Sequence, residues 1–188
     1  MLFRSFNKEE GNNGSPQLKI EFEYSDLNQG KAFVDLNDNL KKDEGEDLKN
    51  ESYPITTEKV SIIGGKFKTL GIKSDQLTTV EINHNELITI GAYQSPALTS
   101  VKVGNAQQLE ELLIFGNGKL AHVTLPAKEK IANLKKLNIL DSNAIEEREE
   151  LFKSLPNRTG KEPKGIVFLS KLLEKEGEIL TDLNWEVQ

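Results

Sequence analysis

Apolar residues recur in the middle of the chain with a short pattern, L-x-x-L-x-I. Seven consecutive matches follow one another, and their first residues are spaced by 10, 10, 11, 11, 11 and 14 positions. The last two apolar places in each unit are separated by one residue, so both point to the same side of a short strand. The seven units begin at Phe67, Leu77, Leu87, Leu98, Leu109, Leu120 and Leu134.

One such unit cannot bury its apolar side alone, whereas stacked units share one continuous core. The pattern therefore predicts a β-rich repeat solenoid over residues 60–143. The alternative is a run of ordinary strands in a β-sandwich, which the near-constant spacing disfavours.

The flanking segments predict smaller elements. Residues 1–17 are polar and rich in Gly and Asn, which is typical of a flexible leader. Residues 18–59 hold two strand candidates, at 18–24 and 31–36, followed by an acidic loop. Residues 144–188 combine a helical stretch, the buried-strand run GIVFLS and a closing strand with Trp185, and we expect this segment to cap the stack.

The text LTTVEINHNELITIGAYQSPALTSVKVGNAQQLEELLIFGN resembles the nested short leucine-rich repeat called IRREKO. The tail, LFKSLPNRTGKEPKGIVFLS followed by LTDLNWEVQ, resembles that family's closing segment. The turn Asn of the family is present at Asn85 and Asn117 but is replaced by Ser95 and Ala106, and the insertion PAKEKIAN (126–133) breaks the last period.

The resemblance implies a leucine-rich-repeat solenoid, α+β overall, with a small N-terminal β element and a C-terminal α/β cap. Because this repeat is common in exported proteins of gut and oral anaerobic bacteria, it also implies a secreted or cell-surface, extracytoplasmic location. The leader SFNKEEGNNG resembles the region after the lipidated Cys of bacterial lipoproteins, with Phe6 where Cys would stand. A lipid anchor in the native precursor is therefore an expectation.

Composition removes several classes of function. The net charge is −6, which gives no electrostatic handle for nucleic-acid phosphates. The absence of Cys excludes disulfides, thiolate nucleophiles and Cys-based zinc sites. No run of about 20 apolar residues is present, so no transmembrane segment is expected. The two histidines, His84 and His122, stand in no catalytic pattern, so no enzyme is expected.

The acidic loop from Asp35 to Glu46 has the ligand spacing of an EF-hand calcium loop. Place 6, normally Gly at the sharp turn, is Leu40, for which a left-handed conformation carries a steric cost. An acidic solvated turn without calcium is the alternative. The expected ligands are Asp35, Asn37, Asn39, Asp43 and Glu46, with the backbone carbonyl of Lys41.

A binding face is expected on one side of the repeats. Alternation turns places 5 and 7 of each unit outward, which exposes Tyr93, Leu113 and Phe115, with Gly91 forming a shallow notch. Such an apolar face favours binding of a protein or a glycan. If the protein's own end segments cover the face, the alternative is a structural spacer without a ligand. The expected face consists of Tyr93, Leu113, Phe115, Ile88 and Glu111.

Overall fold

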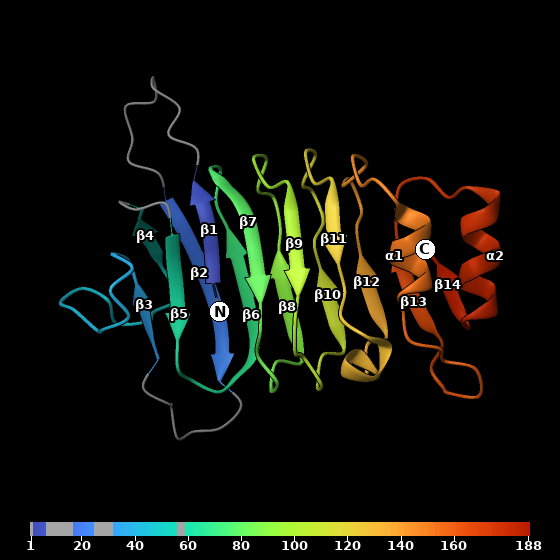
Figure 1. The fold of residues 1–188 in the computed structure, drawn as a ribbon, viewed down its shortest axis with the longest axis horizontal. Coiled ribbons are helices and arrows are strands. Elements are labelled where there is room, and N and C mark those ends of the chain that lie inside the picture. Colours follow the sequence, from blue (N-terminus) through green and yellow to red (C-terminus); the bar gives the residue numbers. More distant parts are fainter. Residues whose placement is uncertain (1, 7–16, 25–31, 56–58) are drawn as a thin grey trace.

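Strands make up most of the regular secondary structure in the described part of the chain. The computed structural model describes residues 2–6, 17–24, 32–55 and 59–188. Among these residues there are two α-helices, α1 (Arg148–Lys153) and α2 (Glu174–Asp182), and one short 3₁₀ turn, η1 (Lys128–Ile131). The strands form two sheets that lie one over the other along the long axis of the molecule (Figure 1).

The first sheet has six strands in the order β11-β9-β7-β1-β5-β3. Strands β7, β9 and β11 are parallel, whereas β1 pairs antiparallel with both β5 and β7, and β3 pairs antiparallel with β5. Its strands are β1 (Leu2–Phe6), β3 (Phe33–Asp35), β5 (Lys59–Ile63), β7 (Leu77–Ile82), β9 (Ser100–Val103) and β11 (His122–Thr124).

The second sheet has eight strands in the order β14-β13-β12-β10-β8-β6-β2-β4. The run from β14 to β6 is parallel, and β2 and β4 are added in antiparallel orientation at one end. Its strands are β2 (Gln17–Tyr24), β4 (Ser52–Pro54), β6 (Phe67–Lys73), β8 (Thr89–Ala92), β10 (Glu111–Leu113), β12 (Lys136–Asn138), β13 (Gly165–Phe168) and β14 (Trp185–Val187).

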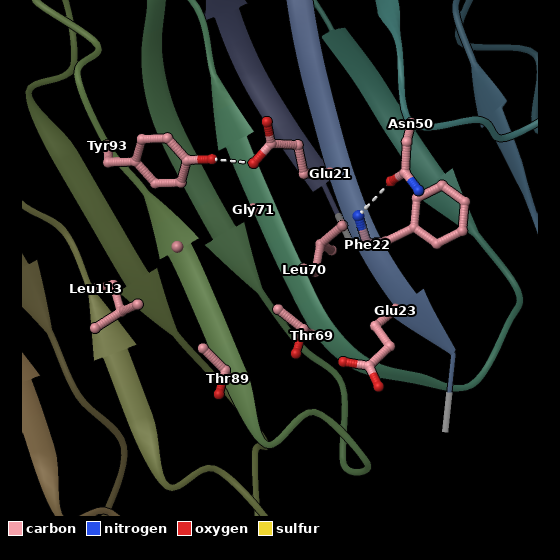
Figure 2. A pocket seen from close by; sticks show the side chains of 11 residues that line it. Glu21, Phe22, Glu23, Asn50, Thr69, Leu70, Gly71, Thr89, Tyr93 and Leu113 are labelled. Carbon is pink, nitrogen blue, oxygen red and sulfur yellow. Dashed lines mark hydrogen bonds between the residues drawn. The ribbon is translucent and has the colours of Figure 1, made fainter. Parts of the chain in front are cut away.

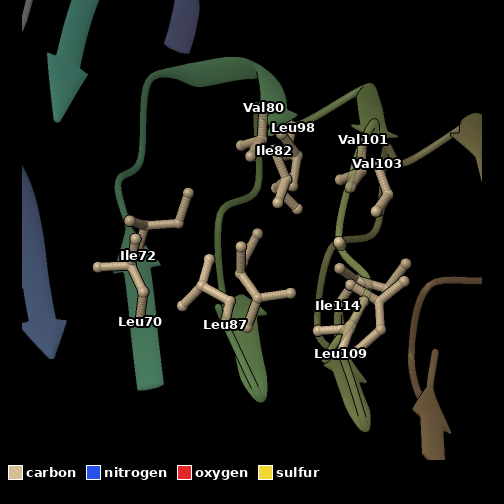
Figure 3. Close-up of a cluster of buried hydrophobic side chains, with 14 of the residues drawn as sticks. Leu70, Ile72, Val80, Ile82, Leu87, Leu98, Val101, Val103, Leu109 and Ile114 are labelled. Carbon is tan, nitrogen blue, oxygen red and sulfur yellow. The ribbon is translucent and has the colours of Figure 1, made fainter. Parts of the chain in front are cut away.

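The hydrophobic core lies between the two sheets (Figure 3). Each of the seven apolar units supplies one strand, and successive units alternate between the sheets. The leading residues Leu77, Leu98 and Leu120 are fully buried. Val123 and Leu125 are the last two apolar places of the unit that begins at Leu120, and the pattern predicts that they are buried. They are only half-buried because β11 is an edge strand with no neighbour on its outer side.

The expected fold class, a leucine-rich-repeat solenoid, is wrong. The structure has two mixed sheets, and in each of them antiparallel strands from the first 63 residues extend the parallel strands. The spacing of the apolar residues indicates only which side chains point into the core, not how the strands are arranged. Strands that alternate between two packed sheets produce the same spacing as the coils of a solenoid, so the pattern alone could not separate the two architectures.

The expected leader over residues 1–17 contains strand β1, which lies between β5 and β7 in the middle of the six-stranded sheet. Residues 7–16 of that leader lie outside the described part of the chain. The expected strands at 18–24 and 31–36 correspond to β2 and β3.

A ladder of polar side chains closes the turns that follow the strands of the eight-stranded sheet. The Ser95 hydroxyl accepts the backbone N–H of Ser74 (3.1 Å), Asn117 Oδ1 accepts that of Ser95 (2.9 Å), and the Ser142 hydroxyl accepts that of Asn117 (3.3 Å). All four residues are buried, so the ladder satisfies backbone groups that water cannot reach.

The C-terminal segment closes one end of the molecule. Helices α1 and α2 cover β13 and β14 on the inner face of the eight-stranded sheet, which is the face turned toward the six-stranded sheet (Figure 1). Arg148 of α1 donates two hydrogen bonds to the buried carboxylate of Glu176 in α2 (2.8 and 2.6 Å). The Trp185 indole donates to the carbonyl of Pro156 (2.9 Å). No described helix or strand covers the opposite, outer face of the eight-stranded sheet.

Candidate functional site

The candidate site lies on this outer face, where β2, β6, β8 and β10 run side by side. The pairing of the strands aligns four outward positions in one row: Glu21, Gly71, Gly91 and Leu113. Two neighbouring strands therefore present glycine at adjacent points, and a depression forms between the larger side chains on either side.

Tyr93 and Phe115 lie beside this row and form an aromatic pair. Their ring centroids are 5.4 Å apart and their planes are inclined by only 5°, which is a stacked arrangement. Both residues are half-buried. Tyr93 follows the end of β8 and Phe115 follows shortly after the end of the neighbouring strand β10, on a face that no described helix or strand covers, so the stacked rings bury part of each other.

The Tyr93 ring leans across the two glycines to reach β2. Its hydroxyl donates a hydrogen bond to Glu21 Oε2 at 2.6 Å (Figure 2). A Cβ atom at Gly71 would lie 3.2 Å from Tyr93 Cε1 and Oη, and one at Gly91 would lie 3.0 Å from Tyr93 Cδ1. Glycine at both positions is what lets the ring lie this close to the sheet.

The surroundings of Glu21 and Tyr93 shift the pKa values of both groups. Hydrogen bonds from Lys19 and from Tyr93 lower the pKa of the Glu21 carboxyl below its usual value. Burial, and then the hydrogen bond to Glu21, raises the pKa of Tyr93 to about 12. Near neutral pH the carboxylate is therefore ionised and the phenol keeps its proton.

A groove of about 320 Å³ occupies the depression. Gly71 and Gly91 form its floor, and Tyr93 and Leu113 stand along one side (Figure 2). The remaining lining comes mainly from polar side chains of β2, β6 and β8 and of the loop before β4: Glu21, Glu23, Asn50, Thr69 and Thr89, with Phe22 and Leu70.

The structure brings some of the expected face residues to the groove and places others outside it. Tyr93 and Leu113 line the groove, whereas Phe115 lies against Tyr93 and does not line it. Glu111 is on the same outer face, with its carboxylate 3.5 Å from Lys136 Nζ. Ile88 is half-buried just before β8 and is not among the groove residues.

Sequence reasoning missed the half of the groove that comes from β2 and β6. The alternation in residues 18–24 placed Leu18 and Ile20 on one face of a strand, and so placed Glu21 and Glu23 on the other. The alternation along residues 18–24 does not indicate which strand β2 pairs with. The antiparallel register that sets Glu21 opposite Gly71 arises only in the folded sheet.

The expected calcium loop lies at the opposite end of the molecule from α1 and α2, between the edge strands β3 and β4 (Figure 1). Asp35 and Glu46 are buried, with 0% and 3% of their surface exposed. Asp35 accepts the backbone N–H groups of Asn39 (3.2 Å) and Leu40 (2.9 Å), and Glu46 accepts those of Leu36 and Asp43 (both 2.8 Å).

The side chains of three further expected ligands, Asn37, Asn39 and Asp43, contact one another. The Nδ2 atoms of Asn37 and Asn39 both donate to Asp43 Oδ2 at 2.7 Å, and these bonds lower the pKa of the Asp43 carboxyl. Lys41 donates its backbone N–H to Asn39 Oδ1 at 2.7 Å, and the role of its carbonyl stays a prediction.

Leu40 adopts the left-handed conformation that place 6 requires, with φ 59°, although it is not glycine. Its side chain is 65% exposed, so the turn forms without burying it. Within the described residues, no group of three or more His, Cys, Asp or Glu side chains is arranged to hold a metal ion. Carboxylate and amide oxygens are the ligands that calcium prefers, and calcium binding by this loop stays a prediction.

Comparison with known proteins gives no relative: no protein-family model, curated protein or solved structure matches the chain. The resemblance to leucine-rich repeats therefore rests on the sequence motifs alone. In the described part of the chain, no helix has the length and apolar character needed to cross a membrane.

Proposed function

We propose that the protein is a non-catalytic binding protein that takes a protein or glycan ligand on the outer face of its eight-stranded sheet. One observation carries the proposal. A groove with two adjacent glycines as its floor and a stacked aromatic pair at its side stands on a sheet face that no described element covers. Partly exposed aromatic side chains beside a depression are typical of binding sites.

The charge states at the groove support binding rather than catalysis. General acid–base catalysis works best with a group whose pKa lies near the working pH. The pKa of Glu21 is lowered and that of Tyr93 is raised to about 12, so both groups are displaced away from neutrality. Their mutual hydrogen bond is suited to fixing the orientation of the Tyr93 ring.

The proposed location is the bacterial cell surface or the extracellular medium, with a lipid anchor in the native precursor. The support is the resemblance of the repeat, the tail and the leader to exported proteins of anaerobic bacteria. Protease treatment of intact cells tests the location: digestion of the protein without lysis supports it, and protection until lysis contradicts it.

The experiment for the binding function is a combined protein and glycan array probed with the purified chain. The double variant Tyr93→Ala/Phe115→Ala should lose the signals that the wild type gives. Thr79→Ala/Lys102→Ala, on the outer face of the six-stranded sheet, is the control and should keep them. Signals that survive loss of both rings contradict the proposed face. A wild type that binds nothing favours the alternative function, a structural spacer.

A second candidate function, calcium binding by the loop from Asp35 to Glu46, is favoured by a specific observation. Two carboxylates are buried there, and the hydrogen bonds that each accepts come from backbone N–H groups. Buried carboxylates are costly unless a positive charge compensates them. A calcium ion held by Asp35, Asn37, Asn39, Asp43 and Glu46 would supply that charge.

Calcium binding is tested by calorimetry and by thermal unfolding. At a calcium concentration of about 100 times Kd, binding should stabilise the folded protein by about 2.7 kcal/mol. Asp35→Asn/Glu46→Gln should abolish this gain while keeping the shape of both side chains. Glu44→Gln, an exposed acid in the same loop, is the matched control and should keep it. No heat of binding and no shift in Tm with calcium would contradict the proposal.

A further inference from the structure

The chemistry of the groove narrows the class of ligand that the outer face takes, and this step rests on the proposed binding function. The groove has two unlike sides. Tyr93 and Leu113 provide aromatic and aliphatic surface, while Glu21, Glu23 and Thr69 provide oxygen atoms. A ligand that fits must carry apolar C–H groups on one side and hydrogen-bonding groups on another.

The aromatic wall presents one ring face to the groove. Phe115 stacks against Tyr93 with nearly parallel planes but does not line the groove, so it covers the face of Tyr93 that points away from it. The Cδ1–Cε1 edge of the ring lies next to the glycine floor. Aromatic faces carry partial negative charge and attract partly positive C–H groups. Phe115 and the hydrogen bond to Glu21 hold this ring in place, so Phe115 acts as a positioning residue.

The charges on the rim are balanced. The Glu21 carboxylate pairs with Lys19, and Glu23 Oε1 lies 3.4 Å from Lys68 Nζ. Each carboxylate is thus matched by a lysine, which gives the groove little attraction for a charged ligand. Ionised carboxylates still accept strong hydrogen bonds from hydroxyl groups. The rim is therefore complementary to a neutral ligand that carries several hydroxyl groups.

The size of the groove points to a small group. A volume of about 320 Å³ lies at the lower end of the range for small-molecule pockets, roughly 300–1,000 Å³. A protein partner would instead rest on an interface of about 800 Å² per side. From the amphiphilic walls, the balanced charge and the size, we infer that the groove binds one neutral sugar ring of a glycan.

The test uses saturation-transfer NMR with the full chain and a panel of monosaccharides. The neutral probes are the methyl glycosides of glucose, galactose and mannose, and N-acetylglucosamine; the charged probes are glucuronate and glucosamine. At least one neutral sugar should receive saturation, with the strongest effect on the C–H groups of one ring face. Binding of glucosamine alone would indicate a cation site and overturn the inference. Equal binding of glucuronate, or no binding by any sugar, would also overturn it.

Variants locate the sugar in the groove. Gly91→Ala places a methyl group on the floor, 3.0 Å from the Tyr93 ring, and should weaken sugar binding about tenfold or more. Tyr93→Ala should do the same by removing the ring. Leu140→Ala removes an apolar side chain that is 39% exposed and does not line the groove, and it should leave binding unchanged. Thermal unfolding of each variant confirms that the fold is kept.

The outcomes separate this inference from the proposed function. If no sugar binds but a protein ligand does, and Tyr93→Ala abolishes that binding, the saccharide inference fails and the binding function stands. If a neutral sugar binds equally well to wild type, Tyr93→Ala and Gly91→Ala, both the inference and the proposed face fail.

Discussion

Removal of the Asn117 side chain should destabilise the protein more than its small size suggests. Its Oδ1 accepts the backbone N–H of Ser95 (2.9 Å), and its Nδ2 donates to the carbonyls of Ala92 (2.7 Å) and Ile114 (3.0 Å). The residue is fully buried. Asn117→Ala takes away all three bonds at once.

The cost follows from the groups left behind. The Ile114 carbonyl keeps the hydrogen bond from the Ser142 hydroxyl at 2.8 Å, whereas Ser95 N–H and the Ala92 carbonyl lose their bonds to Asn117. A buried polar group left without its partner costs about 1–3 kcal/mol, so two such groups give a loss of about 2–6 kcal/mol. For a chain of this length, Tm should fall by roughly 10 °C near the middle of that range.

The assay is urea unfolding followed by circular dichroism, together with thermal unfolding. Asn85→Ala is the matched control because Asn85 occupies the same place in its repeat unit but is exposed, and its change should stay within about 0.5 kcal/mol. Asn117→Ser should recover part of the loss, since serine provides the ladder oxygen at Ser95 and Ser142. Equal, small effects of Asn117→Ala and Asn85→Ala would refute the role of the ladder.

Three further predictions concern the core, the acidic loop and the groove. Leu98→Ala should cost about 2–5 kcal/mol in urea unfolding because Leu98 is fully buried, and a loss below about 1 kcal/mol would show that the site is poorly packed. Leu40→Gly should raise the free energy of unfolding by about 1 kcal/mol, since it removes a left-handed leucine whose side chain is 65% exposed; a lower Tm in calorimetry would contradict this. In an ultraviolet titration, one tyrosine should ionise near pH 12 and disappear in Tyr93→Phe. Because the folded pKa of Tyr93 lies above the unfolded value of 10.0, its contribution to stability is complete below pH 10 and is lost as pH rises toward 12; identical titration curves for wild type and Tyr93→Phe would exclude this.

The sequence located most of the strands because burial controls the spacing of apolar side chains. Leu77, Leu98 and Leu109 are buried where the repeat pattern expects them. The pattern did not encode which strands become neighbours or in which direction they run. Strand β1 shows the limit clearly: its five residues, LFRSF, stand at the start of a segment that is otherwise polar, yet they occupy the middle of a sheet through pairing with β5 and β7.

The candidate site, like the fold, could be predicted from the sequence only in part. Alternation along one strand was enough to turn Tyr93 and Leu113 outward, because side-chain direction is a local property of a strand. The partner of Tyr93 is Glu21, 72 residues earlier in the chain, and their contact depends on the antiparallel pairing of β2 with β6. Only one of the two floor glycines could be predicted from the sequence. Gly91 was expected to leave a notch, whereas the role of Gly71 follows from its pairing with Gly91 in the folded sheet.

The central claim is that the ligand binds on the outer face of the eight-stranded sheet, in the groove beside Tyr93. The most direct measurement is amide chemical-shift mapping of the full chain, titrated with the strongest binder found on the array. The account predicts that the largest shifts fall on Gly71, Gly91 and Tyr93 and that they vanish in Tyr93→Ala. Shifts centred on β7 and β9, or on the loop from Asp35 to Glu46, would contradict it.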